Sequence, residues 1–278
     1  MNLILQAAND IPQQQIEHLA LKSGATRIDQ LDTQTYRMYE TRPHADIAAY
    51  CFEHRIDYGF VPEDKQLADF GLLVMDMDST LISIECIDEI ADMQGLKPQV
   101  AAITEEAMRG EIDFAESLRR RVALLEGLDE GALQRVYDER LKLNPGAEIM
   151  LQRLKSHGIK TLLVSGGFLF FTERLKQRLG LDYTHANTLE IVDGKLTGRV
   201  LGDILDAQGK TDWLIKTRDM LGLKTDQVIA MGDGANDLKM MAQAGVSIAY
   251  HAKPVVREQA SYALNFVGLD GLVRLFDN

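Results

Sequence analysis

Apolar-rich runs separated by amphipathic segments make up most of this chain. The runs occupy residues 72–74, 160–164, 227–231 and 246–249. Strands covered on both faces have such continuous apolar sequences rather than an alternation of apolar and polar residues. Helical patterns lie between them, for example over residues 145–157. This order predicts an α/β fold: a doubly wound, mostly parallel sheet with helices on both faces.

Two segments depart from this pattern. An Asp-Gly pair between apolar residues predicts a β-hairpin at 190–199. Residues 85–142 have helical spacing, seen in the apolar positions Phe114, Leu118, Val122 and Leu125. We therefore expect a helical cap at 85–142, inserted after the first core strand, and a catalytic core formed by 71–84 and 143–278. Such a cap can close over a site and exclude water.

Residues 1–70 have a pattern of their own. The expected segments are a strand at 3–5, a helix at 12–21, a strand at 33–38, a helix at 45–54 and a turn around Gly59 and Pro62. This βαβα order predicts a small α/β module. Dimerisation or scaffolding is its expected role.

Polar residues follow three of the apolar runs. They are Asp76 and Asp78 after the first run, Ser165 and Gly166 after the second, and Asp233, Asn236 and Asp237 after the third. Ligands in α/β sheets bind beyond the carboxyl ends of the strands. Hydroxyls and glycine N–H groups suit phosphate oxygens, and carboxylates suit Mg²⁺. Each group alone also fits an ordinary turn or helix cap, but the three together favour a phosphoryl-transfer site.

The order of these segments resembles the haloacid dehalogenase-like hydrolase superfamily and, within it, the phosphoserine phosphatase family. The resemblance covers roughly residues 70–270, and it rests on Asp76-Met77-Asp78-Ser79-Thr80, Ser165-Gly166-Gly167-Phe168, Lys210 and Gly232-Asp233-Gly234-Ala235-Asn236-Asp237. It implies hydrolysis of O-phospho-L-serine through an aspartyl-phosphate intermediate with Mg²⁺, the last step of serine biosynthesis. Two alternatives are a phosphotransferase to another hydroxyl such as that of homoserine, and a non-catalytic regulatory ligand-binding relative.

The resemblance implies that Asp76 is the nucleophile and Asp78 the general acid and base. We expect burial and neighbouring carboxylates to raise the pKa of Asp78, because it must be protonated at the first step. The side chains of Asp76 and Asp233 and the backbone carbonyl of Asp78 would bind Mg²⁺. Lys210 would balance charge on the phosphoryl oxygens. Its plainer interpretation is a solvated lysine near a helix start, where a cation is disfavoured.

The remaining strand-end residues have supporting roles by the same resemblance. Ser165 and Gly166 would complete the phosphate cradle. Asp237 and Asn236 would orient metal-bound water or Lys210, and Asn236 is also a candidate substrate contact. A helix N-terminal acid is the alternative for Asp237.

Substrate selection is expected from the cap. Glu85 resembles the family position that contacts the substrate ammonium, and Arg121 resembles the one that binds its carboxylate, for which a bidentate guanidinium is suited. Met108 and Phe114 resemble residues that wrap the substrate, although each fits an ordinary core equally well. The plainer interpretation of the three consecutive arginines is a solvated helix face, with Glu116 pairing to the central one.

Composition narrows the function classes. The 278 residues include 42 acidic and 30 basic side chains, and the net charge of −12 speaks against a nucleic-acid or anionic-membrane partner. Cys51 and Cys86 cannot form a disulfide scaffold, no apolar run reaches the roughly 20 residues of a membrane span, and no targeting segment is recognised. We therefore expect a cytoplasmic enzyme acting on a small molecule. A homodimer is possible, and residues 1–70 could be ACT-like, although they lack a glycine-rich effector loop.

Overall fold

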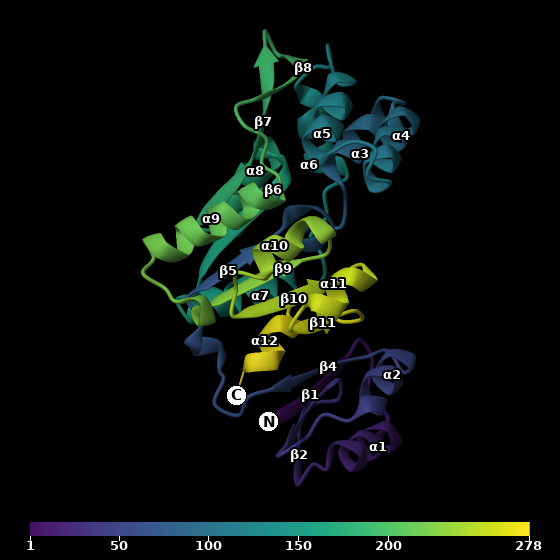
Figure 1. Cartoon of the computed structure of the whole chain (residues 1–278), viewed down its shortest axis with the longest axis vertical. Helices are drawn as coiled ribbons and strands as arrows, with labels where there is room; N and C mark the ends of the chain where they lie inside the picture. Colours follow the sequence, from purple (N-terminus) through teal and green to yellow (C-terminus); the bar gives the residue numbers. More distant parts are fainter. Residues whose placement is uncertain (278) are drawn as a thin grey trace. The chain divides into compact units, whose positions relative to one another are not determined.

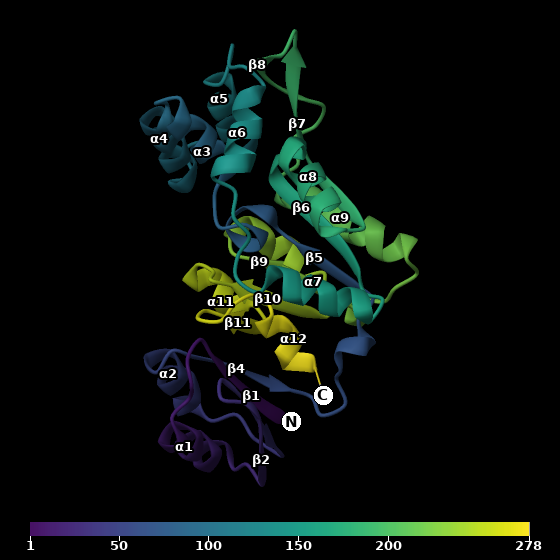
Figure 2. The same ribbon diagram turned by 180° about the vertical axis from the view of Figure 1, so that it is seen from behind.

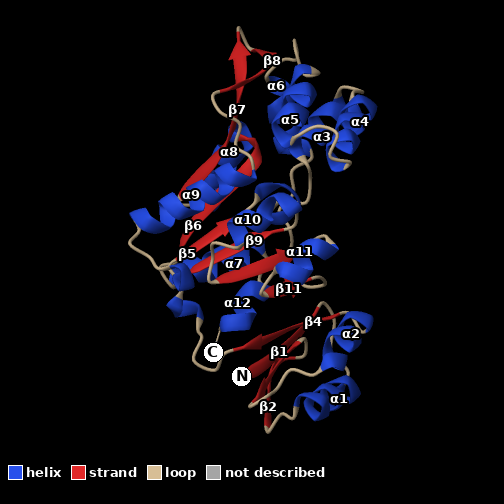
Figure 3. Cartoon of the chain, viewed as in Figure 1, coloured by secondary structure: helices blue, strands red, loops and turns tan. Residues whose placement is uncertain are grey.

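The computed structural model describes residues 1–277, which form two compact units. The first unit comprises residues 1–73, 144–160 and those from 223 onward, and the second comprises 74–143 and 161–222. Figure 3 shows the helices and strands of both units. The division into module, core and cap expected from the sequence stays a prediction.

The N-terminal part of the first unit is a four-stranded sheet in the order β2-β3-β1-β4. Its elements are β1 (Asn2–Ala7), α1 (Gln13–Ser23), β2 (Arg27–Asp32), β3 (Thr35–Tyr39), α2 (Ala45–Glu53) and β4 (Ile56–Val61). Strand β1 pairs antiparallel with both β3 and β4. Both helices cover the same face of the sheet, as Figure 1 shows. They pack on a core that includes Leu3, Leu5, Ile16, Leu19 and Ile47.

Two strands of this sheet were not predicted. The expected turn around Gly59 is wrong, because Gly59 lies inside β4, opposite Ile4 of β1. Its lack of a side chain serves packing, since a Cβ there would lie 2.8 Å from the ring of Tyr262. Strand β2 exposes most of its side chains, so it carries no apolar pattern by which it could be recognised.

The rest of the first unit is an α/β layer. Its elements are α7 (Ala147–Ser156), β9 (Val228–Gly232), α10 (Leu238–Met241), β10 (Val246–Tyr250), α11 (Pro254–Gln259), β11 (Tyr262–Leu264) and α12 (Gly271–Phe276). Strand β10 runs parallel to both of its neighbours, β9 and β11. Strands β9 and β10 are buried along their whole length, which explains their continuous apolar sequences.

The second unit contains a helical segment, a helix-flanked strand region and a hairpin, visible in Figure 2. Its helices are α3 (Cys86–Met93), α4 (Lys97–Met108), α5 (Phe114–Ala123), α6 (Gly131–Glu139), α8 (Leu169–Leu179) and α9 (Ala207–Met220). Its strands are β7 (Tyr183–Val192), β8 (Lys195–Leu201), the second half of β5 (Leu72–Met75) and all but the first residue of β6 (Lys160–Phe168). The predicted hairpin is confirmed: β7 and β8 are antiparallel, and the turn residues Asp193 and Gly194 have φ values of 50° and 73°.

The larger sheet has seven strands in the order β11-β10-β9-β5-β6-β7-β8. The pairs β10–β11, β9–β10 and β6–β7 are parallel, and the β7–β8 hairpin is antiparallel. This confirms the predicted α/β fold with a mostly parallel sheet. Within residues 1–277, no helix has both the length and the apolar character needed to cross a membrane.

Candidate active site

Asp76 stands immediately after the buried strand β5. All four residues of that strand are buried, and Asp76 itself is only 5 % exposed. One carboxylate oxygen, Oδ1, accepts a hydrogen bond from the Met77 amide at 2.7 Å. The chain then turns irregularly over Met77–Leu81, where Ser79 adopts a φ of 56°, unusual for a residue other than glycine. The turn redirects the chain at the point where the carboxylate is presented.

Lys210 is the partner of Asp76. Its Nζ lies 2.6 Å from Asp76 Oδ2, and its side chain is 1 % exposed. Lys210 lies near the start of α9, where the helix dipole disfavours a cation. Burying an ammonium group is also costly unless an anion accompanies it. The solvated-lysine interpretation is therefore wrong, and the site holds a desolvated carboxylate–ammonium pair.

Asp78 is half-buried and lies close to Gly167 at the end of β6. Its Oδ1 accepts a hydrogen bond from the Cys86 amide at 3.1 Å. Desolvation, reinforced by the charge of Glu85, raises the pKa of Asp78 to about 7, while the Cys86 hydrogen bonds and Lys210 act in the opposite direction. The raised pKa expected from the sequence is confirmed. A carboxyl group with this pKa can give and take a proton near neutral pH.

Ser165 and Gly166 lie at the end of β6. Ser165 is fully buried, and its Oγ accepts a hydrogen bond from the Gly167 amide at 2.9 Å. A Cβ on Gly166 would lie 2.8 Å from the ring of Phe114, and one on Gly167 would lie 2.7 Å from Asp78 Oδ2. A side chain at either glycine would therefore displace a neighbouring side chain, that of Phe114 on α5 in one case and that of Asp78 in the other.

Asn187 of β7 also belongs to this region and was not found from the sequence. Its Nδ2 donates to the Gly166 carbonyl at 2.8 Å, and its Oδ1 accepts from the Leu205 amide at 2.7 Å. The side chain is 3 % exposed. These two hydrogen bonds therefore connect the end of β6 with the segment that leads into α9. A single asparagine near the middle of a strand has no surrounding sequence pattern that would predict these two hydrogen bonds.

Glu85 and Arg121 lie in the same unit as Asp76. Glu85 accepts a hydrogen bond from the Ser79 hydroxyl at 2.7 Å. Arg121 is half-buried on α5; desolvation lowers its pKa, and the charges of Asp88 and Glu85 oppose that shift. Within residues 1–277, Arg121 forms no salt bridge; its Nε donates to the Ser117 carbonyl at a long 3.4 Å. Its guanidinium is therefore available to an anionic ligand.

Of two further expectations for residues 85–142, one is wrong and the other stays a prediction. The pairing of Glu116 with Arg120 is wrong, because Arg120 Nη1 lies 2.6 Å from Glu106 Oε2 of the neighbouring helix α4. Arg120 therefore pairs with a glutamate of another helix rather than with one on its own helix. The backbone amide of Glu116 donates to Oδ1 of the N-cap residue Asp113 at 2.7 Å. Met108, the last residue of α4, is 73 % exposed, so its contact with substrate stays a prediction.

In the first unit, Asp233, Asn236 and Asp237 follow β9. Asp237 is fully buried, and its Oδ2 accepts hydrogen bonds from the amides of Asp233 at 3.2 Å and Gly234 at 3.1 Å. Asp237 therefore shapes the loop that carries Asp233. The Asp233 carbonyl accepts a further bond from the Lys253 amide at 3.1 Å. Asn236 is exposed.

Asp233 and Asp237 of the first unit and Asp76 of the second unit are the carboxylates that could hold a metal ion. Carboxylate oxygens are the hard ligands that divalent cations such as Mg²⁺ and Ca²⁺ prefer. The donor set thus fits a metal-dependent site.

Comparison with known proteins agrees with this geometry. Residues 70–245 match the family of haloacid dehalogenase-like hydrolases, and residues 3–47 match a domain of unknown function (DUF4072). A phosphoserine phosphatase of Polaromonas sp. is 58 % identical over 217 residues, which cover 76 % of this chain and 92 % of that protein.

Solved structures resemble the chain over almost its whole length. A haloacid dehalogenase family hydrolase from Salmonella enterica serovar Typhi has a TM-score of 0.90 and 34 % identity, covering 100 % of this chain and 99 % of that one. A probable phosphoserine phosphatase from Vibrio cholerae has a TM-score of 0.87 and 38 % identity, covering 99 % and 86 %. The resemblance inferred from the strand-end motifs is confirmed. This chain belongs to the haloacid dehalogenase-like hydrolases.

Proposed function

We propose that this chain hydrolyses O-phospho-L-serine to L-serine and inorganic phosphate. The observation that carries the proposal is the buried pair in which Lys210 Nζ lies 2.6 Å from Asp76 Oδ2. Such a pair is weak evidence for stability and better explained by chemistry that needs a desolvated carboxylate. The 58 % identity to a phosphoserine phosphatase supports the substrate.

In the first step, an Asp76 oxygen attacks the phosphorus atom and forms a P–O bond. The bond between phosphorus and the serine oxygen breaks, and Asp78 donates its proton to that oxygen, releasing serine. The pKa of about 7 supports this role, because a substantial fraction of Asp78 is then protonated at neutral pH. Lys210, Ser165 and the amide of Gly166 stabilise the negative charge on the phosphoryl oxygens.

In the second step, water attacks the phosphorus of the aspartyl phosphate, and Asp78 takes the proton of that water. The bond between Asp76 and phosphorus breaks, which restores the carboxylate and releases phosphate. One water molecule is consumed in the complete cycle. Covalent catalysis of this kind divides one difficult displacement into two easier ones.

The amino-acid part of the substrate is recognised by two charged residues. Arg121 binds the substrate carboxylate, which supplies the anionic partner that its guanidinium lacks among residues 1–277. Glu85 binds the ammonium group. Phe114 covers the substrate from the cap, where its ring already lies against Gly166. Met108 and Asn236 are further candidate contacts.

We propose Mg²⁺ as the metal ion, held by the side chains of Asp76 and Asp233 and by the backbone carbonyl of Asp78. Asp237 supports this set from the Asp233 loop, which its hydrogen bonds shape. When bound, the ion offsets the mutual repulsion of the carboxylates and the charge of the phosphate. We further propose a cytoplasmic enzyme that forms a homodimer through residues 1–70, which size-exclusion chromatography with light scattering tests.

The activity is tested by incubating the purified chain with O-phospho-L-serine and Mg²⁺, with and without homoserine. Release of serine and phosphate in equal amounts, unchanged by homoserine, supports hydrolysis. Phosphohomoserine formation would replace it with phosphotransfer. No reaction under any of these conditions would favour a regulatory ligand-binding protein.

A further inference from the structure

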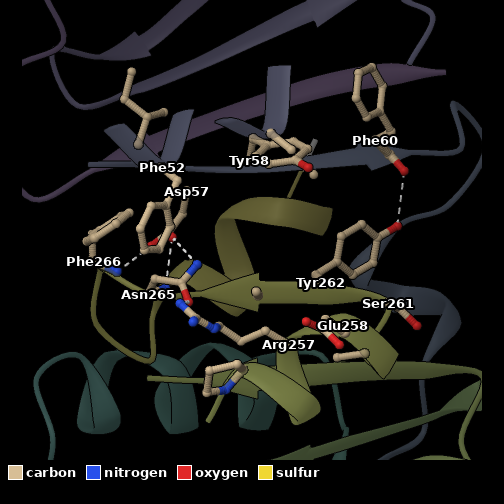
Figure 4. Close-up of a pocket in the computed structure, with 16 residues that line it drawn as sticks. Phe52, Asp57, Tyr58, Phe60, Arg257, Glu258, Ser261, Tyr262, Asn265 and Phe266 are labelled. Atoms are coloured by element: carbon tan, nitrogen blue, oxygen red, sulfur yellow. Dashed lines mark hydrogen bonds between the residues drawn. The ribbon is translucent and has the colours of Figure 1, made fainter. Parts of the chain in front are cut away.

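A pocket of about 550 Å³ lies in the first unit, between the α2–β4 segment on one side and α11 with β11 on the other (Figure 4). None of the predicted site residues lines it. Its size falls within the range of about 300–1,000 Å³ typical of small-molecule sites. The catalytic proposal gives it no role.

Aromatic rings form much of the pocket wall. Phe52, Tyr58 and Phe60 come from one side, and Tyr262 and Phe266 from the other. The rings of Phe52 and Phe266 lie 5.6 Å apart at an angle of 54°. Phe52 is 54 % exposed, although large apolar rings are usually buried. These surfaces suit a planar apolar ligand.

Positive charge gathers at the Phe52–Phe266 end of the pocket. The guanidinium of Arg257 lies 5.4 Å from the Phe52 ring, and that of Arg55 lies 5.0 Å from the Phe266 ring. In Figure 4 the Arg257 side chain runs toward Asn265, to whose Oδ1 it donates one hydrogen bond at a long 3.5 Å. In the part of the chain that the structure describes, Arg257 has no salt bridge. Most of its five N–H donors thus remain for a ligand.

Two other polar side chains of the pocket wall, Asp57 and Tyr262, already form hydrogen bonds within the protein. Asp57 accepts four hydrogen bonds from residues 265–267, so its oxygens are not free to bind a ligand cation. The Tyr262 hydroxyl donates to the Phe60 carbonyl at 3.3 Å. These bonds join the two walls, which makes the pocket preformed. The Glu258 carboxylate lies near Ser261 in Figure 4, away from the Arg257 guanidinium.

We propose that this pocket binds a small organic anion with a planar aromatic body. The anionic group pairs with Arg257, and the ring packs against Phe52 and Phe266. A guanidinium can bind either a carboxylate or a phosphate through two parallel hydrogen bonds, so both kinds of anion are tested. This proposal is independent of the catalytic function.

The test uses the full-length protein and pairs of probes that differ in charge. Anthranilate is compared with the neutral anthranilamide, and adenosine monophosphate with adenosine, by isothermal titration calorimetry. At least one anion should bind about tenfold more tightly than its neutral partner, as expected for one charge-assisted bidentate contact. The variant Arg257→Gln should remove that difference. Lys253→Gln, which makes the same charge change at the N-cap of α11 outside the pocket lining, should retain it.

Three results would overturn the proposal. The first is equal affinity for each anion and its neutral partner, including no measurable binding of either. The second is a charge preference that survives in Arg257→Gln. The third is displacement of the bound anion by O-phospho-L-serine in a catalytically active preparation, because that would place the anion in the catalytic site. Loss of catalysis alone changes none of these readouts.

Discussion

Asp76 and Asp57 are both buried carboxylates, with exposed fractions of 5 % and 1 %, but their partners differ. Asp76 pairs with the Lys210 ammonium at 2.6 Å. Asp57, on β4, accepts its four hydrogen bonds from neutral donors: the amides of residues 265–267 and the Asn265 side chain. Burial alone therefore does not distinguish a carboxylate proposed as a nucleophile from one that holds the fold together.

The difference lies in what each partner leaves available. An ammonium group balances the charge of Asp76, and the hydroxyl of Ser165 and the glycines of β6 lie in the same unit, which supports the proposed attack of the carboxylate on a phosphate. The N–H groups around Asp57 occupy both of its oxygens and fix the loop at 265–267 against β4. Matched substitutions at the two positions should separate these roles.

The largest effect is expected for Asp76→Asn. An amide keeps the volume of the carboxylate but cannot act as the nucleophile, so turnover of O-phospho-L-serine should fall by at least about 10⁴-fold. Steady-state phosphate release measures the loss. The acyl phosphate, trapped by acid quench with labelled substrate and cleaved by hydroxylamine, should disappear, while circular dichroism should still report a folded protein.

The control for this variant is the same change at Asp64, an exposed carboxylate just after β4, which should leave turnover unaltered. Normal turnover in Asp76→Asn would rule out the nucleophile assignment, and Asp76 would then differ from Asp57 only in its hydrogen-bond partners.

Arg121→Ala should have the next largest effect. Removing the guanidinium that binds the substrate carboxylate should lower kcat/KM for O-phospho-L-serine by roughly 100-fold, because the lost contact is bidentate and charge-assisted. p-Nitrophenyl phosphate has no carboxylate and should be affected little. Arg120→Ala is the control, since that side chain is already paired with Glu106. Equal losses on both substrates would make Arg121 structural.

Asp57→Asn should lower stability and leave turnover unchanged, the opposite of the effects expected for Asp76→Asn. Each carboxylate oxygen of Asp57 accepts two hydrogen bonds, so replacing either oxygen with an NH₂ group leaves two donors facing another donor. The free energy of unfolding should fall by about 2 kcal/mol, within the range for unsatisfied buried groups. Urea denaturation measures the loss. Turnover per folded molecule should be unchanged, and a large loss of kcat would place Asp57 in the catalytic machinery.

The contrast also explains which features were predictable from sequence. Asp76, Ser165 and Asp233 were found because each follows a continuous apolar run, and that pattern marks both the strand and the edge where it ends. Strand β4 was missed because Asp57 and Gly59 are turn-forming residues in general. Their strand conformation depends on antiparallel pairing with β1 and on contacts with residues 262–267, far along the chain.

Pairs between distant elements had no sequence signal at all. Asn187 acts through two backbone groups, and the preference of Arg120 for Glu106 depends on how α4 and α5 pack. Local spacing identifies candidates, but only the tertiary arrangement selects among them. The role of each candidate in catalysis stays a prediction until the variants are measured.

The smallest effect concerns the pH dependence of stability. Desolvation raises the pKa of Asp57, although its hydrogen bonds act in the opposite direction. The folded protein therefore holds this proton more tightly than the unfolded chain, whose Asp pKa is about 3.9. Linkage then makes the Asp57 contribution to stability greatest below that value. It declines as the pH rises through the raised pKa of the folded state, and it is constant above it.

The measurable quantity is the difference in unfolding free energy between the wild type and Asp57→Asn, followed by urea denaturation from pH 3.5 to 7. Groups common to both proteins cancel, so the advantage of the wild type should shrink as the pH rises through this window. The corresponding difference for Asp64→Asn should stay flat. An Asp57 difference that grows with pH would mean that the four hydrogen bonds outweigh desolvation and that folding favours the charged form of Asp57.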